Sequence, residues 1–139
     1  MRTFLFAVAL TLCAVLSVGW GAAGPDESSS DVATREAVSA FHRHMERVWH
    51  RAYPARDAEA IEARVPALKQ GAGDILESAK AEGSPESRSA AEKLLESVDE
   101  LEAAFARGDQ DAAFAAVELM HDRFHALMSS LHMGEHEVH

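Results

Sequence analysis

Apolar residues recur at steps of three and four in four stretches of the chain, with charged residues between them. The stripes are formed by Val38, Phe41, Met45, Val48 and Ala52; by Ile61, Val65, Leu68, Ala72, Ile75 and Ala79; by Ala91, Leu94, Val98, Leu101 and Phe105; and by Ala113, Val117, Met120, Phe124, Leu127 and Leu131. This period places one apolar stripe on each of four amphipathic helices. We predict an all-α protein, an antiparallel up-down-up-down four-helix bundle over residues 31–133.

Residues that end and begin helices lie between the stripes. Tyr53-Pro54 should end the first helix, because a residue before proline avoids the helical conformation, and Asp57 can cap the second. Gly83-Ser84-Pro85 supplies a stop, an N-cap and a first-turn proline. Arg107-Gly108-Asp109 supplies a basic last turn, a C′ glycine and a new cap. Connections this short make neighbouring helices antiparallel, so the first and fourth should lie side by side.

Pro66 interrupts the second apolar stripe. Inside a helix, proline removes a backbone hydrogen bond and its ring clashes with the preceding turn. We therefore expect the second helix to kink or to restart at this residue.

The N-terminus has the pattern of an export signal. A basic Arg2 precedes the apolar run Thr3–Val18, and small residues follow at Gly21–Gly24. The run is shorter than the roughly 20 residues that span a bilayer. We predict a signal peptide over 1–23, then a linker over 24–30, in a periplasmic or secreted bacterial protein with no membrane segment after cleavage.

Charge and composition exclude several classes of function. The chain has 23 acidic residues against 13 basic ones, which argues against nucleic acid and anionic membranes as partners. Its only cysteine, Cys13, leaves with the predicted signal, and no nucleophile elbow or phosphate loop is present, so we do not expect an enzyme. Eight histidines, all after the signal, require an explanation. The last of them fall in 134–139, which we predict to be a disordered tail.

Two i, i+4 pairs of potential metal ligands lie on the first and last predicted helices. Such a pair shares one helix face with Cβ atoms about 6 Å apart, so both side chains can bind one ion. Because the two helices should be neighbours, the pairs should lie level with each other. We expect a site for a divalent transition metal, Zn²⁺, Cu²⁺ or Ni²⁺. Its candidate ligands are His42, Glu46, Glu118, His121 and His125.

The last predicted helix resembles the class II cytochromes c, the cytochrome c′-like four-helix bundles. The similarity lies in Arg107-Gly108-Asp109 and the alanine-rich run to His121, which stands where those proteins have the haem-ligating histidine. Their two haem-attaching cysteines are replaced by Val117 and Met120, so covalent haem is excluded. The resemblance implies a bundle that can form a homodimer. Met45 is similar in kind to the methionine that is a sixth iron ligand in some members.

The run from His42 to Asp57 looks like an uncharacterised family of exported bacterial helical proteins, which indicates export and fold only. The sequence leaves three functions open. The first is metal binding. The second is non-covalent haem binding, with Met45 and His121 as axial ligands. The third is a structural or interaction module without a ligand, in which Met45 is ordinary core and the histidines are ordinary surface.

Overall fold

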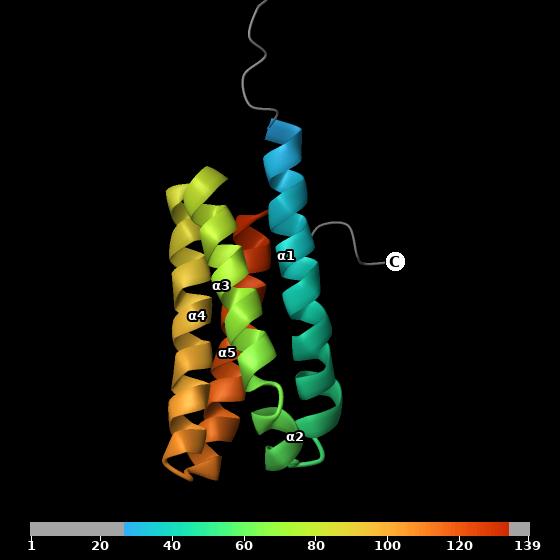
Figure 1. Ribbon diagram of the computed structural model, residues 1–139, viewed down its shortest axis with the longest axis vertical. Helices are drawn as coiled ribbons and strands as arrows, with labels where there is room; N and C mark the ends of the chain where they lie inside the picture. The colour runs from blue at the N-terminus through green and yellow to red at the C-terminus, as the bar shows by residue number, and fades with distance from the viewer. Residues whose placement is uncertain (1–26, 134–139) are drawn as a thin grey trace, which may run out of the picture.

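The computed structural model describes residues 27–133, apart from the side chains of 27–31 and 82. The chain forms α1 (Glu27–Arg47), a π-helical turn η1 (Val48–Ala52), α2 (Ala58–Glu62), α3 (Val65–Glu82), α4 (Pro85–Ala106) and α5 (Gln110–Ser130). Figure 1 shows the four long helices alongside one another, with short α2 at one end. The prediction of an all-helical fold with four main helices is confirmed. The predicted signal peptide and tail lie outside the described residues.

The helices begin at the capping residues that the sequence predicted. The side chains of Asp57, Ser84 and Asp109 each accept a hydrogen bond from a backbone N–H three residues on. Each bond satisfies one of the donors that the first turn of a helix leaves unpaired. Between α4 and α5, Gly108 adopts a φ of 68°, which glycine tolerates without steric cost.

The start of the first helix differs from the prediction. α1 begins at Glu27, inside the stretch 24–30 that we expected to be a linker. Serine and aspartate favour caps and turns but do not forbid a helix, and the following apolar stripe allows the helix to extend backwards.

Pro66 restarts a helix. α2 ends at Glu62, a turn covers Ala63 and Arg64, and α3 begins at Val65 with the proline in its first turn. The missing N–H of proline costs nothing there, because first-turn N–H groups have no partner within the helix. The second helix of the sequence prediction is therefore two helices that meet at an angle set by this break.

The end of the first helix contains a wider turn that the sequence did not reveal. The N–H of Tyr53 bonds the carbonyl of Val48 at 2.8 Å, and the N–H of Asp57 bonds that of Ala52 at 2.9 Å, both five residues back. A π-helical turn of this kind inserts an extra residue and rotates the side chains that follow. The helix then ends at Tyr53-Pro54, as predicted.

The apolar stripes form one core. Nearly all their side chains are buried, among them Phe41, Leu68, Leu94 and Phe124 at 0–1% exposure. Side chains of α1 and α5 meet in this core, where the rings of Phe41 and Phe124 lie with centroids 5.3 Å apart. Among residues 27–133, no helix is both long and apolar enough to cross a bilayer.

Candidate functional site

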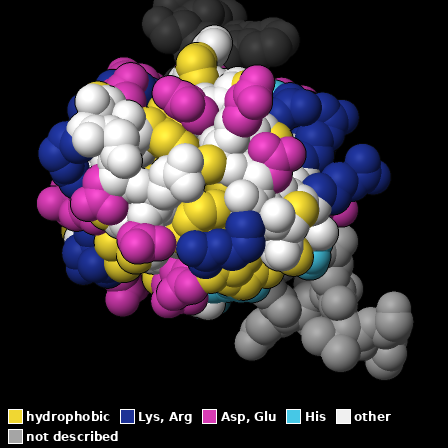
Figure 2. Space-filling model, turned by 90° about the horizontal axis from the view of Figure 1, so that it is seen from below, with side chains coloured by type: hydrophobic (Ala, Val, Ile, Leu, Met, Phe, Trp, Pro, Cys, Tyr) yellow, Lys and Arg dark blue, Asp and Glu magenta, His cyan; other side chains and the backbone are white. Residues whose placement is uncertain are grey.

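Aromatic and imidazole rings line the contact between α1–η1 and α5, which we call the ring seam. It consists of Phe41, His42, Trp49, Tyr53, Phe114, Glu118, His121, Phe124 and His125. His42 stacks on Phe124 with centroids 5.5 Å apart, and Trp49 stacks on His121 at 3.8 Å. Seen from the α2 end, histidine reaches the surface at one edge of the molecule (Figure 2). The seam therefore joins the core to an imidazole-bearing surface.

His121 and His125 form the closest pair of potential ligands in the seam. Their Nε2 atoms are 3.2 Å apart, and the rings meet edge to face. Without a metal, one protonated Nε2 can donate a hydrogen bond to the lone pair of the other. Two nitrogens at this separation, each about 2.05 Å from an ion, would subtend about 100° at that ion. This angle lies between the square-planar and the tetrahedral value, and chelation also requires the proton on the donor Nε2 to move to Nδ1 and both lone pairs to turn toward the ion.

The surroundings keep His121 neutral. Partial burial under Trp49, and then the nearby His125, hold the pKa of His121 below its ordinary value of 6.5, and His50 acts in the same direction. Asp122 opposes them weakly, since its carboxylate is 3.9 Å from Nδ1 and exposed to solvent. Neutral imidazole is the form that binds metal, so the lowered pKa of His121 favours ion binding by this residue at neutral pH.

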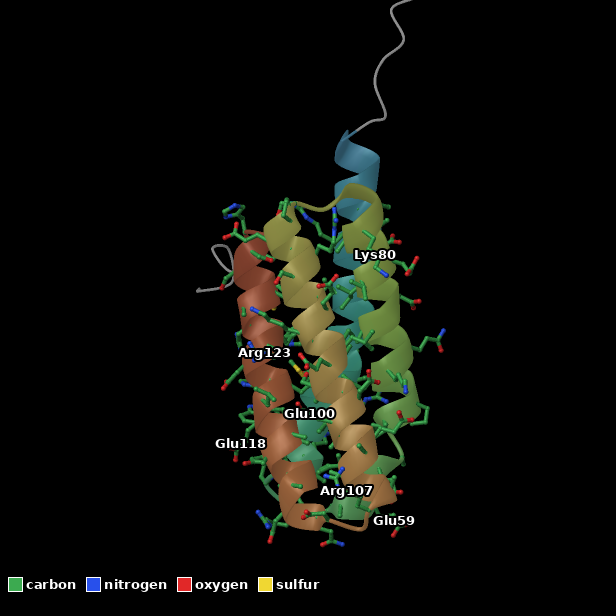
Figure 3. All side chains as sticks on the ribbon, turned by 90° about the vertical axis from the view of Figure 1, so that its left-hand side faces the viewer. Glu59, Lys80, Glu100, Arg107, Glu118 and Arg123 are labelled. Atoms are coloured by element: carbon green, nitrogen blue, oxygen red, sulfur yellow. The ribbon has the colours of Figure 1, made fainter. Side chains whose placement is uncertain are left out.

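Glu118 is held by a neighbour that the sequence analysis did not identify. The phenol of Tyr53 donates a hydrogen bond to the Glu118 carboxylate, and this bond is the main cause that raises the Tyr53 pKa above 10.0. Glu118 projects from the outer side of α5, one turn before His121 (Figure 3). The only signal in the sequence was the position of Tyr53 at the end of the first helix, facing the start of the last.

The other predicted ligands do not join the pair. The His42 ring lies against Phe124, and the Glu46 side chain is exposed. Within the described part of the chain, no group of three or more His, Cys, Asp or Glu side chains is arranged to hold an ion. The expected five-residue set is therefore reduced to His121 and His125, with Glu118 one turn away in a hydrogen bond to Tyr53.

Met45 and His121 are each packed against other side chains. Met45 is 3% exposed in the core, the Phe41 and Phe124 rings pack together, and Trp49 covers one face of His121. A haem with these two residues as axial ligands would have to displace that packing. The sulfur of Met45 fills the core here, which is the common use of methionine at such positions.

The His121–His125 pair and the aromatic rings that cover it are thus the candidate ligand-binding residues between α1–η1 and α5. No family profile, characterised protein or solved structure matches this chain, so the function has to be argued from these residues.

Proposed function

We propose that this protein binds a divalent transition metal through His121 and His125, as an exported periplasmic protein folded as an antiparallel up-down-up-down bundle. Two imidazoles one turn apart on a helix are a known arrangement for holding a metal ion. Water completes the coordination, or Glu118 does after it leaves Tyr53. This ligand set is narrower than the five residues expected from spacing alone.

The observation that carries the proposal is the 3.2 Å separation of the two Nε2 atoms. Exposed imidazoles on a helix ordinarily diverge, because side chains lose rotamer freedom when they are held together. Here the stack of Trp49 on His121 fixes one ring, and His125 meets it. A bidentate site that is already arranged loses less entropy on binding than two free side chains.

The ligand types favour borderline metals. Imidazole suits Zn²⁺, Cu²⁺ and Ni²⁺, whereas Mg²⁺ and Ca²⁺ prefer oxygen. Cu²⁺ should bind most tightly among the divalent first-row ions, following the general order of stability for nitrogen ligands. The acidic chain, at −10 overall, attracts any cation and adds no discrimination between them.

The test is a titration of the mature protein with Cu²⁺, Ni²⁺ and Zn²⁺. Binding is monitored by calorimetry and by tryptophan fluorescence. Trp49 reports directly because its ring stacks on His121, and Cu²⁺ bound there should quench it. An ion at 100 times its Kd should stabilise the native state by about 2.7 kcal/mol. The melting temperature should rise accordingly.

Matched variants separate the pair from the remaining histidines. His121→Ala and His125→Ala should each lose most of the affinity, while His132→Gln, an exposed histidine just beyond α5, should not. Both sets are made in a background with His136→Gln and His139→Gln, which removes the tail histidines. Equal binding by His121→Ala and His132→Gln, or no binding by the parent protein, would refute the proposal and leave a module without a metal.

A further inference from the structure

A concave site lies beside η1 and is lined by residues other than those of the ring seam. A pocket of about 420 Å³ is lined by Arg47, Val48, Arg51, Ala52, Asp57, Ala60 and Arg64. Val48 and Ala52 are buried and form an apolar floor, and three of the other lining residues are arginines. The volume is in the range of small-molecule sites in proteins.

Two local irregularities of the backbone bring these residues together. Arg51 belongs to the π-helical turn η1, and Arg64 lies in the break between α2 and α3 that Pro66 creates. In one uninterrupted helix, residue 64 would continue the surface of the second helix. The break instead turns Arg64, which is half-buried, toward the end of α1. π-Turns inside helices are frequent at functional sites.

The charge of the pocket is unusual for this acidic chain. Among the described residues, Arg56 pairs with Asp111, Lys69 with Asp99 and Glu102, and Lys80 with Glu77, and the other lysine and arginine side chains, inside and outside the pocket, form no ion pair. None of the three pocket arginines forms an ion pair with another described residue. The one acid in the pocket, Asp57, has an oxygen committed to the N–H of Ala60. Three positive charges and one negative leave the pocket with a surplus of two positive charges.

In the view from the α2 end, basic side chains lie at the right-hand edge, at the left-hand edge and near the lower centre, with acidic ones between them (Figure 2). The residues that line the pocket carry a net positive charge, opposite in sign to that of the whole chain. A concave surface lined by one sign of charge concentrates ions of the other sign.

We propose that this pocket binds a small organic or inorganic dianion, held by the guanidinium groups of Arg47, Arg51 and Arg64. Guanidinium groups bind carboxylate and phosphate oxygens with two parallel hydrogen bonds, which suits arginine, rather than lysine, at all three positions. A doubly charged anion neutralises the surplus of the pocket, and the apolar floor accommodates a short carbon chain. The site shares no side chain with the ring seam, so it does not depend on the metal proposal.

The test uses two probes, inorganic phosphate and succinate, added to the full mature chain at constant ionic strength set with chloride. Binding is measured by calorimetry and by shifts of backbone amide signals in NMR spectra. Both probes should saturate at millimolar concentration or below, and the shifts should be confined to residues 47–64. Saturation by phosphate alone assigns the site to phosphate esters, and saturation by succinate alone assigns it to carboxylates.

Variants establish which side chains are responsible. Arg51→Gln and Arg64→Gln should each weaken binding at least tenfold, and Arg64→Lys should weaken it even though the charge remains. Arg43→Gln is the matched control. It removes an arginine charge from α1 one turn before Arg47, at a position that does not line the pocket. Circular dichroism checks that each variant is folded. Absence of saturable binding of both probes, or equal weakening by Arg43→Gln and Arg64→Gln, would overturn the proposal.

Discussion

The two sides of the bundle differ in how many aromatic and imidazole rings they contain. The fully buried side chains of α3 and α4 are aliphatic or small: Leu68, Ala72, Ile75, Ala91, Leu94, Val98 and Leu101. Between α1–η1 and α5 lie rings, several of which reach the surface, including Trp49, Tyr53 and His121. Aliphatic packing stabilises the folded state but contains no group that can bind a ligand through polar atoms. Rings such as those of Trp, Tyr and His combine apolar packing with polar atoms that can form hydrogen bonds. If the proposed metal site is correct, the residues that bind the ion lie apart from the aliphatic packing of α3 and α4.

The largest effect should come from the aliphatic side. Leu94→Ala removes a side chain with 0% exposure and should lower the free energy of unfolding by about 2–5 kcal/mol, because it leaves a cavity in the core. Urea unfolding measures the loss, and Ni²⁺ affinity of the folded fraction should stay unchanged. Leu95→Ala, at the half-buried neighbouring position, should cost clearly less. A similar loss in both variants would contradict the division of roles.

A substitution in the ring seam should change stability less than Leu94→Ala does, but it should change metal affinity. Trp49→Leu removes the stack on His121 and Tyr53, which should cost about 0.5–1.5 kcal/mol of stability. It should also lower metal affinity several-fold, because His121 loses the ring that fixes it. Phe105→Leu is the control, since it replaces a half-buried ring on α4, away from the seam. Comparable loss of metal affinity in the control would mean that the stack does not position the ligand.

A smaller effect should appear in the titration of Tyr53. Its pKa stands above 10.0 mainly because it donates a hydrogen bond to Glu118, and the negative charge of Glu118 disfavours the phenolate. Glu118→Ala should therefore lower this pKa toward 10.0, and Glu118→Gln should lower it part of the way. Phenolate absorbance reports the change without ambiguity, because Tyr53 is the only tyrosine. An unchanged titration in Glu118→Ala would show that the bond does not form in solution.

The smallest expected effect is a change in the pKa of His121 when His125 is replaced. His125→Ala should raise the pKa of His121 toward 6.5, since one cause of its lowering is removed while burial remains. Because the native pKa is below the unfolded one, the unfolded chain takes up the proton first on acidification. Stability from this group is therefore full above pH 6.5 and declines as the pH falls through 6.5 toward the native pKa. NMR titration of the imidazole signals measures the shift, and a drop in the pKa of His121 in the variant would contradict the arrangement.

Most of the helices and their ends followed from local rules in the sequence, except the start of α1 and the π-helical turn η1. The spacing of Val98 and Leu101, the capping by Ser84 and Asp109 and the stop at Tyr53-Pro54 each depend on residues within a few positions along the chain. Hydrophobic period and backbone sterics act at that range, so these features could be predicted. Even the break at Pro66 was foreseeable, although its use in shaping a pocket was not.

The candidate sites were decided by contacts between distant segments. Spacing showed that His121 and His125 share a face, but the stack of Trp49 on His121 and the bond from Tyr53 to Glu118 join residues 65 or more positions apart. Likewise, the π-turn before Tyr53 sets where Arg51 stands relative to Arg64. Periodicity alone fixes which side of a helix a residue occupies. Rotation and register between helices, which decide what that residue meets, arise only when the whole core packs together.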